Sequence, residues 1–204
     1  MIAVLAMLAT RFARATTPPA DASDDTLVER HRAGDPDAFA ALYRAHAAAV
    51  YRRLSRILGP IAERDDLVQD VFLALHGALP RFRGQARVST LIHRIAIHKA
   101  IEHLRRQGRR PATVVDGWFF EDLPTPASTP EHRVAAREQL EIVLACLARI
   151  KPKKRVAYLL RVVDGMSFEQ IGELVDASAE TVAKRVQHGQ RELEQLLARE
   201  EVSP

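Results

Sequence analysis

The side chains best suited to contact nucleic acid form a stripe near the C-terminal end of this 204-residue chain. The stripe combines cations with hydrogen-bonding groups: Glu180, Thr181, Lys184, Arg185 and His188. On a helix these positions face away from the apolar positions Val182, Val186 and Leu193. Such a stripe can enter a DNA major groove, where base edges present donors and acceptors. The same pattern also fits the solvent-facing side of a helix in an ordinary bundle, so the stripe alone leaves both interpretations open.

The residues around the stripe predict a helix-turn-helix over residues 167–193. Ser167 can cap the first helix, and Gln170, three residues later, can reach back to the cap nitrogen. One face of that helix is apolar, through Phe168, Ile171, Leu174 and Val175. A tight turn follows, made of Asp176, Ala177 and Ser178. This layout presents the second helix and its stripe to a partner.

Nothing in the sequence has the pattern of an enzyme site. The eight histidines form no HExxH pair, and no glycine-rich phosphate loop follows a strand. Asp65 and Asp66 diverge by about 100° on a helix, which makes them a poor carboxylate dyad. The single cysteine, Cys146, excludes an internal disulfide and lies in an apolar run that predicts burial. We therefore expect a non-enzyme without a cofactor or a metal site.

Composition predicts a soluble all-α fold. Apolar residues make up 47% of the chain and aromatic residues 5%, while strand-like alternation is scarce. The net charge of +4 is too small to indicate a nucleic-acid partner by itself. Whether the chain binds nucleic acid must therefore be judged from where its cations lie in the sequence. The apolar run at residues 1–8 is too short to span a bilayer, and its arginines follow it. We expect a disordered tail over residues 1–23, no membrane insertion and a cytoplasmic protein.

A change of charge divides the chain. Residues 111–130 contain four prolines, three acids and no Lys, Arg or His, which predicts an extended acidic linker. The linker could occupy a basic groove on a partner, although a solvated spacer fits equally well. Residues 81–110 contain nine Lys and Arg residues against one acid. Cations around a loop over residues 82–90 suit a phosphate backbone, and a loop suits pockets for unstacked bases.

Several helices are expected before the linker, over residues 24–32, 36–58 and 65–79, with another over 91–106. Within the third helix, Asp66, Gln69 and Asp70 form a polar face beside an apolar one. An acidic, partly exposed helix is a poor DNA surface and suits docking to a protein. In the last of these helices Arg94, His98 and Arg105 lie beside an apolar core stripe.

Four segments in order resemble a known family: GDPDAFAALYRAH, DLVQDVF, RFRGQARVSTLIHRIAIHKAIEHLRR and KKRVAYLLRVVDGMSFEQIGELVDASAETVAKRV. Together they resemble the bacterial extracytoplasmic-function (ECF) sigma factors, small specificity subunits of RNA polymerase, over residues 24–197. The resemblance implies two small helical domains joined by a flexible acidic linker. These are a sigma region 2 bundle at residues 24–110 and a sigma region 4 helix-turn-helix at 131–200, with the linker at 111–130.

The same resemblance assigns roles to residues. The residues that would bind core RNA polymerase are Asp66, Gln69 and Asp70. Those that would bind the −10 promoter element are Phe82, Arg83, Arg87, Arg94 and His98. The −35 element would be read by Thr181, Lys184, Arg185 and His188, and residues 134–160 would rest on the polymerase flap. The linker would thread the RNA exit region. A stress or envelope regulon and an anti-sigma partner are further expectations from the family.

The sequence departs from the family pattern at several positions. Leu91, His98 and Lys151 stand where the family often has Trp, Asn and Pro, and Asp176 replaces the usual turn glycine. In the second helix Ala183, Lys184 and Arg185 replace a Lys-Ser-Arg pattern, which changes the expected −35 preference. Two alternatives remain open at this stage: a stand-alone helix-turn-helix repressor or activator, and a protein-binding adaptor descended from a sigma factor.

Overall fold

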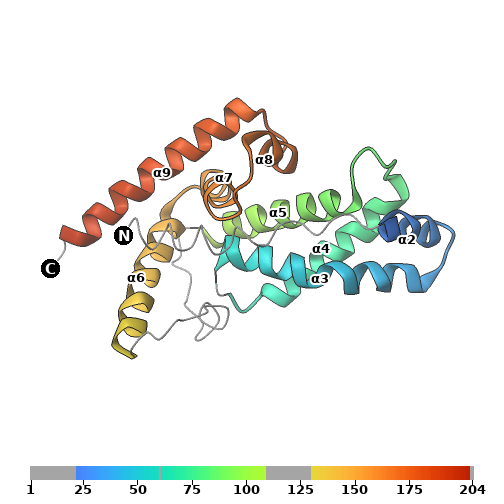
Figure 1. Ribbon diagram of the computed structural model, residues 1–204, viewed down its shortest axis with the longest axis horizontal. Helices are drawn as coiled ribbons and strands as arrows, with labels where there is room; N and C mark the ends of the chain where they lie inside the picture. The colour runs from blue at the N-terminus through green and yellow to red at the C-terminus, as the bar shows by residue number, and fades with distance from the viewer. Residues whose placement is uncertain (1–21, 60, 109–129, 203–204) are drawn as a thin grey trace.

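The computed structural model describes residues 22–59, 61–108 and 130–202, and these residues form helices and short loops without a strand (Figure 1). This confirms the all-α prediction. Residues 1–21 of the predicted tail and residues 111–129 of the predicted linker lie outside the described residues, whereas residues 22 and 23, predicted as the end of the tail, are helical. Within the described ranges, no helix has the length and apolar content needed to cross a membrane.

The first domain contains helices α2 (Ala22–Arg32), α3 (Pro36–Leu58), α4 (Arg64–Ala78) and α5 (Val88–Gln107), with a 3-10 turn, η1 (Leu79–Arg81), between the last two. Its core is aliphatic, and Leu42, Leu54, Leu75, Ile92 and Ile97 are fully buried. Asp35 caps helix α3, since its carboxylate accepts a hydrogen bond from the Asp37 amide at 2.9 Å, and Pro36 follows at the first helical position.

The predicted start of α5 is wrong by one turn. The helix begins at Val88 rather than Leu91, because the extended Arg87 acts as its cap and the Arg87 carbonyl accepts hydrogen bonds from the Thr90 and Leu91 amides. Burial of Val88 fixes this early start. The loop of the basic segment is therefore shorter than predicted and spans residues 82–87.

The second domain contains helices α6 (Pro130–Arg149), α7 (Pro152–Val162), α8 (Phe168–Val175) and α9 (Ala179–Val202). Helix α7 packs along α9, and α8 closes one end of the pair (Figure 1). Cys146 is buried as predicted, and burial raises the pKa of its thiol. The two domains also pack on each other, since α5 contacts both α7 and α8, and α3 contacts α7. The sequence had indicated two linked domains but not this contact.

The turn between α8 and α9 requires a close backbone approach. The Ala177 amide donates to the Gly172 carbonyl at 3.1 Å, and a Cβ added at Gly172 would lie 2.5 Å from the Ala177 carbonyl oxygen. Asp176 sits in the left-handed region with φ 49° and ψ 59°, a conformation that Asp adopts more easily than most residues. Gly172 therefore sets how closely the two helices of the motif approach.

Gly172→Ala should destabilise the chain by about 1–3 kcal/mol, because the new methyl group meets backbone that cannot move independently. Gly77→Ala is the matched control: Gly77 is also helical, and its added Cβ has no atom within 4 Å. That control should be stabilising by about 0.4–1 kcal/mol. Urea unfolding followed by circular dichroism measures both, and equal effects would contradict the close-approach argument.

Candidate functional site

A complete capping box positions the helix-turn-helix. The Gln170 amide donates to Ser167 Oγ at 3.2 Å, and the Ser167 amide donates to Gln170 Oε1 at 2.8 Å. The apolar faces of both helices are buried as predicted, with Ile171, Val182 and Leu193 at 1% exposure or less. The sequence therefore predicted the local structure of this motif correctly.

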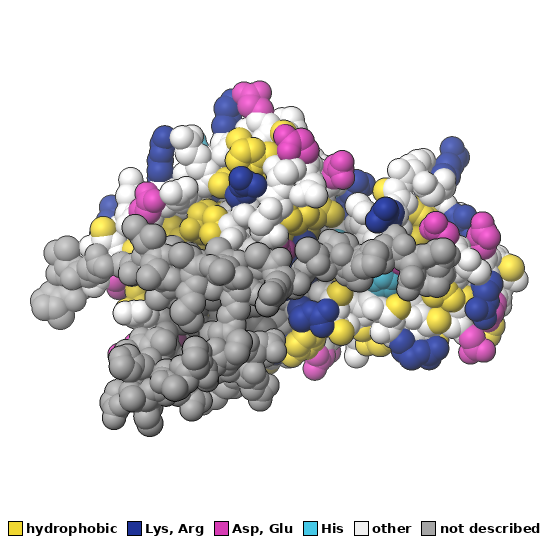
Figure 2. All heavy atoms as spheres, viewed as in Figure 1, with side chains coloured by type: hydrophobic (Ala, Val, Ile, Leu, Met, Phe, Trp, Pro, Cys, Tyr) yellow, Lys and Arg dark blue, Asp and Glu magenta, His cyan; other side chains and the backbone are white. Residues whose placement is uncertain are grey.

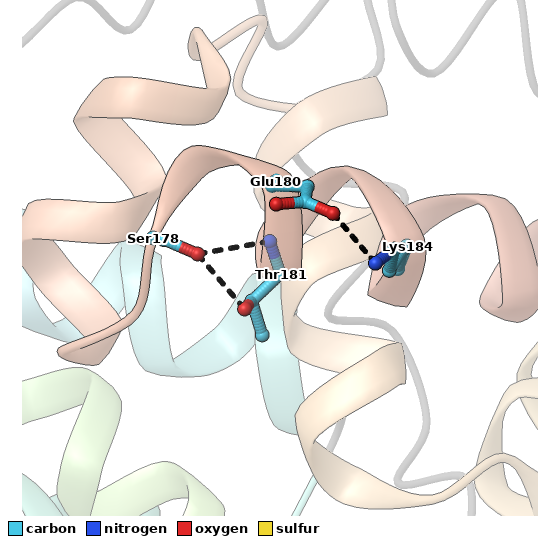
Figure 3. A network of polar contacts seen from close by, with 4 residues as sticks. All are labelled: Ser178, Glu180, Thr181 and Lys184. Carbon is cyan, nitrogen blue, oxygen red and sulfur yellow. Dashed lines mark hydrogen bonds and ion pairs between the residues drawn. The ribbon is translucent and has the colours of Figure 1, made fainter.

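The polar stripe lies on the first turns of α9 (Figure 3). Ser178 Oγ accepts a hydrogen bond from the Thr181 amide at 3.2 Å and lies 2.9 Å from the Thr181 hydroxyl. Lys184 Nζ donates to Glu180 Oε1 at 2.6 Å, and these side chains are 69% and 77% exposed. Exposed pairs of this kind contribute little free energy, so Lys184 can exchange Glu180 for a phosphate or a base edge.

The other two predicted members of the stripe differ in accessibility. His188 is exposed, whereas Arg185 is half-buried. On the face seen in Figure 2, Lys and Arg side chains are interspersed with carboxylates and do not gather into one basic patch. Recognition by this surface would therefore depend on particular side chains more than on a broad positive field.

A cavity of about 490 Å³ opens beside the basic loop of the first domain. Its lining contains one cation, an aromatic ring, an amide and aliphatic groups: Ala74, Gly77, Ala78, Arg81, Phe82, Gln85 and Leu91. Phe82 also packs against the domain core, which fixes one wall, while Arg83 and Arg87 are exposed on the loop. An aromatic ring beside a polar amide and a cation suits an unstacked base with its phosphate.

The structure brings two predicted DNA-binding residues of α5 against the helix-turn-helix. Arg94 Nη1 lies 3.9 Å from Asp176 Oδ1, and His98 Nε2 lies 3.5 Å from Asp176 Oδ2. All three side chains are at least 39% exposed, so these contacts are screened and weak. Arg105 does not join them; it lies farther along α5.

Buried ion pairs join the domains below this contact. Asp164, which follows α7, lies 2.8 Å from Arg56 Nε and 3.4 Å from Arg53 Nη1, and none of these side chains is more than 9% exposed. Burial lowers the pKa of Arg53, while the neighbouring Asp164 carboxylate opposes that shift. Sequence reasoning missed this cluster, because nothing local in the sequence says which acid meets two arginines that lie about 110 residues earlier.

The predicted docking face on α4 is accessible. Asp66 and Gln69 are exposed, and Asp70 is half-exposed with Lys99 Nζ 3.9 Å from its carboxylate. Leu73, one turn later on the same helix, is 71% exposed, and Tyr43 of α3 is 39% exposed. An apolar centre with a polar rim is typical of a protein interface. Leu73 was not predicted from the sequence as part of the docking face. Its helical spacing from Asp66 and Asp70, which puts all three residues on one face of the helix, could have identified it.

Comparison with known proteins gives matches in both domains. Residues 42–110 match Sigma-70 region 2, and residues 140–193 match Sigma-70 region 4. The chain is 33% identical over 170 residues to the ECF RNA polymerase sigma-E factor of Escherichia coli K12, covering 80% of this chain and 88% of the relative. It is 29% identical over 185 residues to the RNA polymerase sigma-H factor of Pseudomonas aeruginosa PAO1, covering 85% and 93%.

A similar fold occurs in a solved structure of CnrH in complex with the cytosolic domain of CnrY. That chain superposes with a TM-score of 0.57 and 21% sequence identity, covering 86% of this chain and 97% of that one. The likeness extends through both helical domains.

Asp164→Asn should destabilise the chain by about 3–5 kcal/mol, because it removes the charge of the carboxylate that two buried guanidinium groups share. Glu102→Gln is the matched control, since it removes the exposed pair with Arg106, which is worth at most about 0.5 kcal/mol. Urea unfolding compares the two variants. A loss for Asp164→Asn no larger than for the control would show that the buried pairs do not hold the domains together.

Proposed function

The chain belongs to the ECF RNA polymerase sigma factors, which bind core RNA polymerase and direct initiation at promoters, and we propose how its residues divide that task. The main support is the order of the two matched regions, with an exposed docking helix in the first and a capped helix-turn-helix in the second. A stand-alone repressor is not favoured, because it gives no reason for a region 2 match over residues 42–110.

Core polymerase docks on α4. Asp66, Gln69 and Asp70 supply the polar rim, and the exposed Leu73 and Tyr43 supply the apolar centre. Burying an exposed leucine and tyrosine gives the free energy of association, while the carboxylates give orientation and partner choice. Helix α4, which carries Asp66, Gln69, Asp70 and Leu73, is not among the described helices that join the two domains, which are α3, α5, α7 and α8.

The −10 element is captured by the loop over residues 82–87 and by the start of α5. An unstacked base enters the cavity beside Phe82 and Gln85, and Arg83 and Arg87 hold the adjacent phosphates. Unstacking a base costs a few kcal/mol, which stacking on an aromatic ring can offset. Arg94 and His98 complete the surface, and His98 gives this chain a base preference different from that of relatives with Asn.

The −35 element is read by the first turns of α9. Thr181, Lys184, Arg185 and His188 are the reading residues, and the guanidinium of Arg185 is the group suited to a bidentate contact with guanine. We assign the first domain to residues 24–110 and the second to 131–200, with α6 and α7 resting on the polymerase flap. The acidic linker over residues 111–130 passes through the RNA exit region.

Promoter reading requires the two domains to separate. The −10 and −35 elements lie about 25 base pairs apart, or roughly 85 Å at 3.4 Å per base pair. In this structure the two domains are packed together, since α5 contacts α7 and α8, and Arg94 and His98 lie against Asp176 in the turn of the helix-turn-helix. The described arrangement is therefore a closed form, and binding to polymerase selects an open one.

The partners and the cellular location of the chain follow from its role as a sigma factor. It works with polymerase in the cytoplasm, catalyses no reaction of its own and uses no cofactor. Its regulon answers a stress or envelope signal. An anti-sigma protein that binds both domains would keep them closed.

Charge reversal at Asp66 and Asp70 should weaken association with core polymerase at least tenfold, because it places repulsion inside the docking surface. Glu29→Lys, an exposed change on α2 away from this surface, is the control. Co-elution with sigma-free core polymerase on a sizing column, followed by titration, measures the effect. Unchanged affinity of the double variant would remove the assignment of α4, whereas failure of the unmodified chain to co-elute would remove the proposal as a whole.

Arg185→Ala should reduce promoter-specific initiation by the value of one base contact, about 1–3 kcal/mol or roughly 5- to 150-fold. Polymerase binding should not change, because Arg185 lies on the DNA-facing stripe. Run-off transcription from a promoter bound by this factor gives the initiation rate, and sizing chromatography gives the affinity for polymerase. A parallel loss of both activities would indicate a folding defect and contradict a role in base reading.

A further inference from the structure

A cavity of about 410 Å³ lies between the two domains, at the C-terminal end of α5 and the N-terminal end of α7. One wall is apolar and is formed by Leu58, Leu104, Ile150 and Pro152. The remaining lining is rich in cations: Arg105, Arg149, Lys151 and Arg155, with Glu192 as the only acid. The size falls within the range of small-molecule sites.

Arg155 is the least expected member of this lining. It is 3% exposed, its Nη2 donates to the Leu58 carbonyl at 3.3 Å, and its Nε has no hydrogen-bond partner. No carboxylate of the described residues pairs with it, and burial lowers the pKa of its guanidinium to about 10. A buried charge without a counter-ion is strongly unfavourable, so an anion in this cavity would relieve a penalty already present in the fold.

The neighbouring cations are also available. Arg105 is exposed at the end of α5, and Lys151 is exposed at the cap of α7, where no side chain caps the helix. Glu192 and Arg149 are already engaged, Glu192 by Lys154 and Arg149 by Glu200 at 3.1 Å. Arg105, Lys151 and Arg155 therefore line the same cavity with no carboxylate of the described residues paired to them, and the positive end of the α7 dipole adds to their field.

We propose that this cavity binds a small phosphate-bearing ligand of about nucleotide size. A phosphate neutralises more of the three converging charges than a single carboxylate does, and guanidinium groups bind its oxygens in pairs. The apolar wall of Leu58, Leu104 and Ile150 accommodates the ring that such a molecule carries. Arg105 belongs to the first domain and the other two cations to the second, so the bound ligand holds the domains closed.

Isothermal titration calorimetry of the full chain with pyrophosphate and with adenosine monophosphate, at constant ionic strength, tests this site. One equivalent should bind, and the Arg105→Ala/Lys151→Ala double variant should lose at least tenfold in affinity. Arg44→Ala/Arg52→Ala is the matched control, since it removes two exposed cations of α3 outside the cavity lining and should bind as the unmodified chain does. Absence of saturable binding, or equal losses in both double variants, would overturn the proposal.

Thermal unfolding tests the role of the buried arginine. Pyrophosphate should raise the melting temperature of the unmodified chain but not that of Arg155→Met, which fills the same space without charge. An equal rise in both would contradict the proposal, and if Arg155→Met does not fold, the Arg105→Ala/Lys151→Ala variant takes its place.

A short DNA duplex should not displace pyrophosphate, because a duplex cannot enter this cavity; displacement would assign the cations to DNA instead. None of these measurements needs polymerase or a promoter.

Discussion

The buried ion pairs of Asp164 with Arg56 and Arg53 are the polar contact on which the closed packing of the two domains depends. They fix α7 against α3 in an environment where the charges are shielded from water. Once that contact is made, α8 lies on α5, Asp176 meets Arg94 and His98, and Arg155 is covered by the end of α3. A single carboxylate thus pairs with two arginines of the first domain and helps to hold the two domains in the closed arrangement.

This dependence also explains how the closed form can open. The hydrogen bond from Arg155 to the Leu58 carbonyl is weak, and so are the exposed ion pairs of Asp176 with Arg94 and His98. The buried charge of Arg155, which has no counter-ion among the described residues, works against closure. The closed form is therefore held mainly by apolar packing and by the Asp164 cluster. A polymerase that binds both domains in the open form needs only differential contacts of a few kcal/mol to shift the population.

Much of the fold could be predicted from the sequence, because helix caps and turns depend on interactions between neighbouring residues. The capping box of Ser167 and Gln170 and the turn that starts at Asp176 each depend on neighbouring residues, and both were predicted correctly. The start of α5 was missed because burial of Val88, a tertiary effect, extends the helix beyond its sequence signal. The Asp164 and Arg155 contacts could not be predicted, since each joins residues about 100 positions apart. The resemblance named the family, whereas only the structure showed that α5 of the first domain packs against α7 and α8 of the second.

The most direct measurement of the central claim is the distance between the domains in the free chain and in its complex with core polymerase. Spin labels at Arg44→Cys on α3 and Arg191→Cys on α9 lie at exposed positions, and the native Cys146 is buried at 1% exposure. Pulsed dipolar spectroscopy should give one short, narrow distance distribution for the free chain and a distinctly longer one in the complex. The same short distribution in both states would contradict a closed form that must open to read a promoter.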